Sequence, residues 1–164
     1  MLSLRKGSGI MFEIKKLKFK HILQIDHLMI DRQITCLIGP SGSGKTTLLR
    51  MLNRLNEAEE GSIYFNGVDI KEMHPIKLRR KIIMLGQTPI LYSGTIADNL
   101  QIGLRLSEQP LADENRLLAY LDKVGLHKEL NDTCEKLSGG EKQRLCLARV
   151  LLMDADVYLA DEPS

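Results

Sequence analysis

The sequence has few aromatic residues and few cysteines. Tryptophan is absent, and aromatic residues make up only 4% of the chain. The three cysteines, Cys36, Cys134 and Cys146, are far apart and form no C-x-x-C pair. An odd and scattered set of thiols argues against a disulfide framework and against metal binding. We therefore expect free, buried thiols in a reducing compartment.

Long apolar runs and an excess of one charge are also missing. No stretch approaches the roughly 20 apolar residues that a helix needs to cross a bilayer, and the first residues contain no secretory apolar segment. The 23 basic and 21 acidic residues leave a net charge of +2, so we expect no nucleic-acid partner. A length of 164 residues with 43% hydrophobic composition predicts one soluble, cytoplasmic domain.

Short apolar segments predict several β-strands. The run 34–38 is rich in β-branched residues and stops at Gly39, which is typical of a fully buried strand. Asn66-Gly67 suits the positive φ angles of a type I′ turn and predicts a hairpin. The predicted strands are 22–30, 34–38, 62–65, 68–70, 82–85 and 157–159.

Helical spacing of apolar residues follows Gly44 and returns between residues 95 and 136. The apolar positions are 48, 49, 52 and 55 in the first case, and 117, 118, 121 and 124 in the second. Gly125 is placed to end the second helix. Because no turn-flanked apolar run occurs between 95 and 136, we predict a helical insert within an α/β domain.

Residues 39–46 match the complete pattern G-x-x-x-x-G-K-[ST] between a predicted strand and a predicted helix. Glycines let backbone N–H groups turn toward a phosphate, and the helix start adds a positive dipole end. Lys45 offers a cation for the β- and γ-phosphates, and Thr46 offers a hydroxyl for Mg²⁺. The alternative is a glycine-rich turn that binds nothing. The candidate nucleotide-binding residues are Gly39, Pro40, Ser41, Gly42, Ser43, Gly44, Lys45, Thr46 and Thr47.

A second candidate anion site lies at Ser138-Gly139-Gly140. Ser138 and Glu141 have the spacing of a capping box, which predicts a helix over residues 141–152. Two glycines in a first turn cost about 1 kcal/mol each relative to alanine. Bare backbone beside a hydroxyl at a helix start suits an anion. The alternative is an ordinary cap with a flexible entry.

Two adjacent carboxylates follow the predicted strand 157–159. Side chains alternate along a strand, so Asp161 and Glu162 are expected to point in different directions. Beside a phosphate loop, one carboxylate is suited to Mg²⁺ and the other to the water that attacks a γ-phosphate. Gln87 follows another predicted strand and is a candidate for the same water or metal. The alternatives are a polar strand end before Pro163 and a solvated glutamine.

The segment 137–141, LSGGE, resembles the signature motif of ABC-type ATPases. The phosphate loop, Gln87, the signature and Asp161-Glu162 follow that family's order and approximate spacing, and the resemblance covers nearly the whole chain from residue 11. It implies an α/β fold: a P-loop NTPase (RecA-like) core with a small antiparallel β subdomain and a helical insert, lacking the last core elements. The implied division is a tail (1–10), a nucleotide-binding core with the β subdomain (11–92), a helical signature subdomain (93–140), and the signature helix with the carboxylate strand (141–164).

The resemblance also implies the cofactors ATP and Mg²⁺ and a head-to-tail dimer with a second ATP-binding subunit. In that dimer the phosphate loop of one copy faces Ser138, Gly139 and Gly140 of the other. The implied catalytic residues are Lys45, Gln87 and Glu162, and the implied Mg²⁺ ligands are Thr46, Gln87 and Asp161.

Residues 87–100 resemble the same region of export-type members of the family. Leu91 and Tyr92 are therefore candidate contacts with a transmembrane permease subunit, and the alternative is packing inside the helical insert. The implied location is cytoplasmic, peripheral on the inner face of the cell membrane.

The sequence departs from the family's pattern in two places. The aromatic residue that stacks on adenine has only Phe19 or His21 as candidates. In addition, all four histidines precede Asp161, so none matches the family's switch histidine. These departures imply a truncated chain that binds ATP weakly and hydrolyses it negligibly by itself. Met1 and Met11 are both open as the start of translation.

Two other function classes are open. The first is a soluble ABC ATPase of DNA repair or translation. The repair forms place coiled-coil heptads between the phosphate loop and the signature, but the interval 87–138 is short and has no sustained heptad pattern. The translation forms carry two cassettes, and one is present here. The second class is a nucleotide-binding fragment that does not hydrolyse ATP.

Overall fold

The computed structural model describes residues 9–31 and 34–162. It divides into two compact units, Met1–Arg79 and Arg80–Ser164. Most of the predicted N-terminal tail, residues 1–8, lies outside the described part of the chain.

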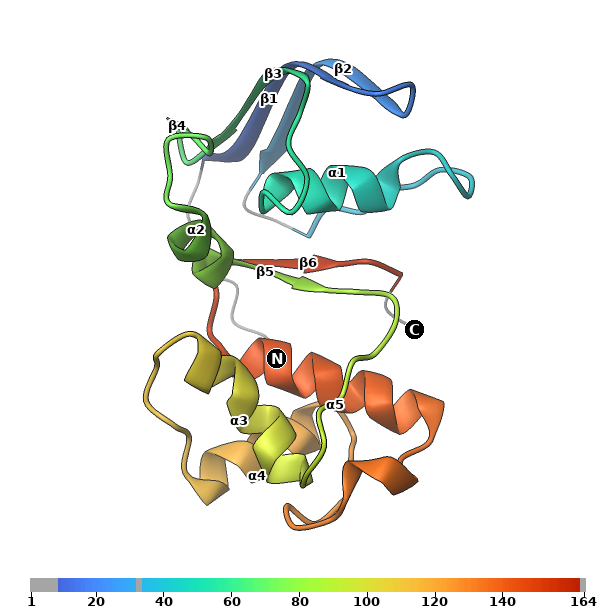
Figure 1. Ribbon diagram of the computed structural model, residues 1–164, viewed down its shortest axis with the longest axis vertical. Helices are drawn as coiled ribbons and strands as arrows, with labels where there is room; N and C mark the ends of the chain where they lie inside the picture. The colour runs from blue at the N-terminus through green and yellow to red at the C-terminus, as the bar shows by residue number, and fades with distance from the viewer. Residues whose placement is uncertain (1–8, 32–33, 163–164) are drawn as a thin grey trace. The chain divides into compact units, whose positions relative to one another are not determined.

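The first unit contains a four-stranded antiparallel sheet with strand order β2-β1-β3-β4 (Figure 1). The strands are β1 (Ile10–Phe19), β2 (Leu23–Asp31), β3 (Glu60–Phe65) and β4 (Val68–Asp69). Asn66 and Gly67 join β3 to β4 with φ angles of 51° and 82°, and Phe65 pairs with Val68 across them. The predicted hairpin turn with two positive φ angles is confirmed.

One face of this sheet is apolar because of the side-chain alternation along β1. Phe12 and Ile14 are buried, and an irregularity between Lys15 and Lys18 shifts the alternation so that Leu17 is also buried. The rings of Phe12 and Phe65 lie 5.1 Å apart between centroids. Helix α1 (Lys45–Leu52) contributes a buried face to the same unit. The buried residues of α1 are Leu48, Met51 and Leu52.

Helix α1 ends earlier than the apolar spacing predicted. Its C-cap is Asn53, and the next residue, Arg54, has a φ of 55°, which breaks the helical path. Leu55 is 52% exposed. The fourth apolar position of the predicted helix is therefore outside it.

The prediction of a buried strand at 34–38 is wrong. These residues form no strand, and Ile34 and Ile38 are 80% and 95% exposed. A strand needs a neighbour that completes its hydrogen-bond ladder, and within the described residues no strand pairs with this segment. The apolar pattern reports which side chains favour burial, but it does not supply that neighbour.

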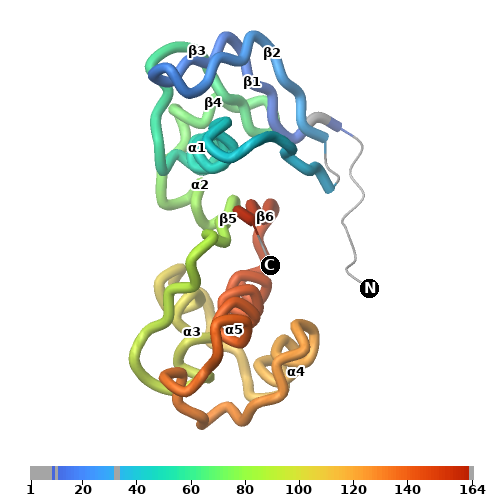
Figure 2. Tube along the Cα trace, turned by 90° about the vertical axis from the view of Figure 1, so that its right-hand side faces the viewer, coloured from blue at the N-terminus to red at the C-terminus, as the bar shows by residue number. Residues whose placement is uncertain are grey.

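The second unit contains a parallel strand pair and a group of helices (Figures 1 and 2). Strand β5 (Ile82–Leu85) follows helix α2 (Pro75–Lys81) and pairs in parallel with β6 (Val157–Ala160). The remaining elements are α3 (Ile96–Leu106), α4 (Glu114–Lys123), the 3₁₀ turn η1 (Cys134–Lys136) and α5 (Gly139–Leu152). The strands predicted at 82–85 and 157–159 are confirmed.

The helices of the second unit share an apolar core. The cluster includes one face of each of the helices α3, α4 and α5. Its helical members are Ile96, Leu100, Leu104, Leu117, Leu121, Leu145, Ala148 and Leu152. Helix α4 ends as predicted, with Gly125 at a φ of 65° just after the C-cap residue. Among the described residues, no helix has the length and apolar character needed to span a membrane.

Gly61 is the most constrained glycine of the sheet and gives a test of the fold. Its φ is +85°, and a Cβ there would lie 2.3 Å from the backbone oxygen of Lys16. We expect Gly61→Ala to lower the free energy of unfolding by about 3 kcal/mol or more, measured by urea denaturation. Gly67→Ala is the control: its φ is +82° but its Cβ meets nothing within 4 Å, so the cost is about 1–2 kcal/mol. Equal losses in the two variants would contradict the described packing of Gly61.

Candidate nucleotide site

The loop 39–44 in the first unit has the backbone shape of a phosphate cradle. Gly42 and Gly44 have φ angles of 78° and 91°, in the left-handed region that glycine adopts without a steric penalty. The N–H of Ser43 donates to the carbonyl of Pro40 at 3.3 Å, which tightens the turn. A Cβ on Gly39 would lie 2.8 Å from the Ser43 hydroxyl. Backbone conformation thus favours glycine at positions 42 and 44, and a side chain at position 39 would require the Ser43 hydroxyl to move.

The side chain of Lys45 folds back over this loop. Its ammonium donates to the carbonyls of Gly39 and Pro40, both at 2.9 Å. An ammonium has three donors, and the loop carbonyls use two of them. Lys45 also begins α1, whose N-cap, Gly44, contributes no side-chain capping bond. Thr46 and Thr47 lie in the first turn of the same helix.

Three of the predicted site residues follow the carboxyl ends of strands β5 and β6: Gln87, Asp161 and Glu162. The ladder pairs Leu85 with Ala160, and the N–H of Asp161 extends it by donating to the Leu85 carbonyl at 3.0 Å. Asp161 is 6% exposed, whereas Glu162 is exposed and has a φ of 48°. The two carboxylates therefore have different surroundings, as the strand pattern predicted.

Gln87 and Glu162 are brought into direct contact. The side-chain amide of Gln87 donates to Oε2 of Glu162 at 2.7 Å, although the two residues are 75 positions apart. They line a small cavity of about 50 Å³ together with residues of α5, including Gln143 and Arg144. A cavity of this size has room for a few water molecules; its lining is mostly apolar, and Gln87 and Glu162 are among its polar residues. The sequence predicted both residues for one site, but not the bond between them.

Ser138 begins α5 through the predicted capping box. Its hydroxyl accepts from the N–H of Glu141 at 3.3 Å, and Oε2 of Glu141 accepts from the N–H of Ser138 at 2.8 Å. Gly139 and Gly140 form the first turn, and all three signature residues, Ser138 included, are exposed. The hydrogen bond from the Ser138 backbone, followed by the contact with Lys128, lowers the pKa of Glu141 to about 2.

A buried polar network behind the Gln87 segment was not predicted from the sequence. Asn99 is fully buried; its amide donates to the carbonyls of Tyr92 and Thr95, and its oxygen accepts from the N–H of Tyr92. Arg149 of α5 donates to both oxygens of Asn99, at 2.7 and 2.8 Å, and to the carbonyl of Ile90 at 2.8 Å. This network fastens residues 90–95 to α3 and α5. No local signal marks Asn99 or Arg149, because most of the contacts in this network join residues 7 to 59 positions apart.

The other candidate contact residues lie in different surroundings. Leu91 packs against the helical core, which is the alternative to a permease contact, whereas Tyr92 is 48% exposed with the Arg149 guanidinium 5.5 Å from its ring centroid. Phe19 ends β1 and is half-buried, and His21 is exposed in the following turn.

Of the cysteines, Cys134 and Cys146 are buried, and burial raises the pKa of both thiols. Cys36 is exposed, so the prediction of burial is wrong for it. It lies in the segment 34–38, which forms no strand to cover it.

Most of the chain matches the model of a known protein family. The family model described as ABC transporter matches residues 24–164. The chain belongs to the ABC transporter family. The resemblance drawn from the LSGGE segment and the phosphate loop is therefore confirmed, and so is the P-loop NTPase fold class.

Two curated proteins from different organisms are similar to this chain. The "ABC transporter I family member 17" of Arabidopsis thaliana is 44% identical over 133 residues, which cover 80% of this chain and 50% of that protein. The "Phosphate import ATP-binding protein PstB" of Pyrobaculum aerophilum is 42% identical over 149 residues, covering 82% and 59%. The chain thus spans about half the length of these curated relatives.

A solved structure is also similar. The structure of a bacterial Atm1-family ABC exporter with ATP bound has a TM-score of 0.80 and 26% identity, and the match covers 99% of this chain and 30% of the other.

The pKa of the Glu141 carboxylate gives a test of the capping box that Ser138 and Glu141 form at the start of α5. Because its pKa is lowered from 4.5 to about 2, the cap is complete above pH 4.5 and is lost as the pH falls through about 2. We expect the Glu141 side-chain carboxyl carbon to titrate near pH 2 in an NMR experiment on the folded protein. A midpoint near 4.5 would show that the capping box and the Lys128 contact are not formed in solution.

Arg149 gives a stability test of the buried network. Arg149→Met keeps the aliphatic stem but removes three charged hydrogen bonds, two to the fully buried Asn99 and one to the carbonyl of Ile90. We expect the free energy of unfolding to fall by about 2–4 kcal/mol. Arg144→Met, at an exposed position of the same helix, is expected to change it by less than about 0.5 kcal/mol. Similar losses in both variants would contradict the account of the network.

Proposed function

We propose that this chain binds the triphosphate of ATP at the loop 39–47. The observation that carries the proposal is the position of Lys45, whose ammonium lies against the Gly39 and Pro40 carbonyls at the start of α1. A helix start without a side-chain cap favours an anion, because backbone N–H groups and the dipole both face it. The chain's match to the ABC transporter family supports ATP as the particular ligand.

We propose Mg²⁺ as the second cofactor, because the three ligands that the resemblance implies carry oxygen atoms. Mg²⁺ prefers oxygen ligands and is usually held by one or two carboxylates together with substrate phosphates. Thr46, Asp161 and Gln87 supply a hydroxyl, a carboxylate and an amide oxygen. Across residues 9–31 and 34–162, no group of three or more His, Cys, Asp or Glu side chains is arranged to hold a metal by itself. A Mg²⁺ ion here would therefore depend on phosphate oxygens, and it would neutralise their charge during transfer.

Hydrolysis is the second part of the proposal. Glu162 is exposed beside a small cavity, and the Gln87 amide donates to one of its oxygens at 2.7 Å. A carboxylate fixed in this way can accept a proton from a water in the cavity, which is the role of a general base. Gln87 would orient both that water and Glu162. Asp161 is buried beside the strand end and would serve the metal instead.

A complete site is proposed to need two copies of the chain. Ser138, Gly139 and Gly140 expose a hydroxyl and backbone at the start of α5, which suits the γ-phosphate of a nucleotide held by another copy. In such a head-to-tail dimer, ATP is bound between the phosphate loop of one copy and the signature of its partner.

The dimer is proposed to drive transport by a transmembrane permease, with the chain on the cytoplasmic face of the membrane. Relatives named as transporter components support this. The exposed residues Tyr92 and Ile90 are the proposed permease contacts. Arg149 holds this segment by donating a hydrogen bond to the carbonyl of Ile90. Export is proposed because residues 87–100 resemble the same region of export-type members of the family.

Removal of the Lys45 ammonium tests nucleotide binding directly. We expect Lys45→Ala to weaken binding of a fluorescent ATP analogue roughly tenfold or more, because a charged hydrogen bond to phosphate contributes about 1.5–3 kcal/mol. Lys77→Ala removes the same charge at an exposed position of α2 and should leave the affinity unchanged. Equal affinity of the wild-type and Lys45→Ala proteins would refute the proposed site.

A further inference from the structure

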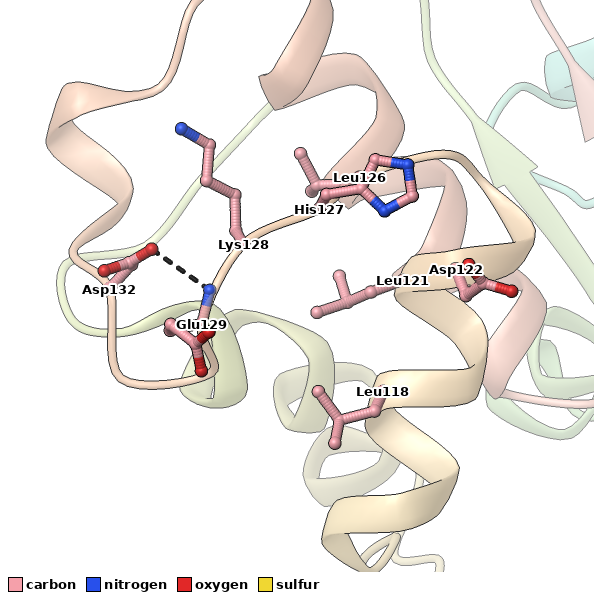
Figure 3. Close-up of a pocket in the computed structure, with 8 residues that line it drawn as sticks. All are labelled: Leu118, Leu121, Asp122, Leu126, His127, Lys128, Glu129 and Asp132. Carbon is pink, nitrogen blue, oxygen red and sulfur yellow. Dashed lines mark hydrogen bonds between the residues drawn. The ribbon is translucent and has the colours of Figure 1, made fainter.

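The loop that follows α4 contains a basic residue close to the signature. Residues 126–132 form one wall of a cavity of about 400 Å³, and Leu118, Leu121 and Asp122 of α4 contribute another (Figure 3). Lys128 is in this loop, and in Figure 3 its side chain extends away from Leu118 and Leu121.

The ammonium of Lys128 contacts the carboxylate that caps the signature helix. It lies 3.0 Å from Oε1 of Glu141, and the two side chains are only 35% and 21% exposed. The other oxygen of Glu141, Oε2, accepts from the backbone N–H of Ser138 at 2.8 Å. One carboxylate therefore joins Lys128 to Ser138 through its two oxygens.

The backbone that carries Lys128 is itself held in place. The N–H of Glu129 donates to Asp132 at 3.1 Å, shown by the dashed line in Figure 3. The carbonyls of Leu130 and Asp132 accept from the N–H groups of Ala97 and Ile96 at the start of α3, at 2.9 and 3.0 Å. Leu126 is 2% exposed and belongs to the helical core. Lys128 thus reaches Glu141 from an anchored loop rather than from a free one.

We propose that Lys128 is a positioning residue of the signature: it fixes the Glu141 side chain, and Glu141 fixes Ser138 in the orientation that meets a nucleotide on a second copy. The inference rests on the proposed function for its last step. Without Lys128, Glu141 keeps its capping bond but gains rotamer freedom, since only one of its oxygens is held. Ser138 and the two glycines after it would then sample more orientations.

The test compares three variants of the full chain. Lys128→Met keeps the aliphatic length and removes the charge, whereas Lys128→Arg keeps the charge and should rescue the effect. Lys136→Met is the matched control, because Lys136 is exposed two residues before Ser138 and the charge change is the same.

The first measurement is amide hydrogen exchange at residues 138–141 without nucleotide. We expect Lys128→Met to speed exchange about two- to fivefold, the range for loss of a partly exposed ion pair, with wild-type rates in Lys128→Arg and Lys136→Met. Unchanged exchange in Lys128→Met, or an equal increase in Lys136→Met, would overturn the proposal.

The second measurement separates positioning from a general structural effect. With millimolar ATP and Mg²⁺, Lys128→Met should need about two- to fivefold more ATP for association of two copies, while binding of the ATP analogue to single copies stays at the wild-type affinity. Weaker binding to single copies would overturn the positioning role. If the wild type itself does not associate with ATP, the two-copy function fails, and the exchange rates still decide whether Lys128 holds Ser138.

Discussion

The parallel ladder between β5 and β6 is the interaction on which the chemistry of the second unit depends. It pairs Leu85 with Ala160, and the extra bond from Asp161 to Leu85 extends that register past the end of β6. Parallel strands end at the same edge, so the residues that follow them meet. Gln87 and Glu162 lie in contact for this reason, and a slip of one residue would exchange the buried Asp161 for Glu162.

The two glycine-rich helix starts differ in how they are capped. Helix α5 is closed by its own capping box, with Glu141 held from two sides. Helix α1 begins at Lys45 with a glycine N-cap and no side-chain capping bond. A phosphate would supply that missing cap to α1, whereas the signature presents its backbone already ordered. This contrast suits one loop that holds a nucleotide and another that meets a nucleotide held elsewhere.

Local signals predicted the local features. The hairpin at Asn66-Gly67, the C-terminal glycine of α4 and the capping box at Ser138 all depend on residues within four positions of one another, and each is confirmed. The buried strand at 34–38 failed because strand formation depends on a distant partner. The same limit applies to contacts between remote residues: Gln87 with Glu162, Asn99 with Arg149 and Lys128 with Glu141. No spacing rule in the sequence joins these pairs, because tertiary structure creates them: the β5–β6 ladder brings Gln87 to Glu162, and the packing of the helices and their loops brings the other two pairs together.

The central claim is that one nucleotide site is made from two copies, and a mixing experiment tests it most directly. One copy carries Lys45→Ala; the other carries Gly139→Asp, which has open space for its side chain and is tolerated at a helix start but repels phosphate. In sedimentation with millimolar ATP and Mg²⁺, each variant alone should stay monomeric, whereas the mixture should associate, because one intact loop then faces one intact signature. Association of Gly139→Asp alone, or no association of the mixture when the wild type associates, would contradict the account.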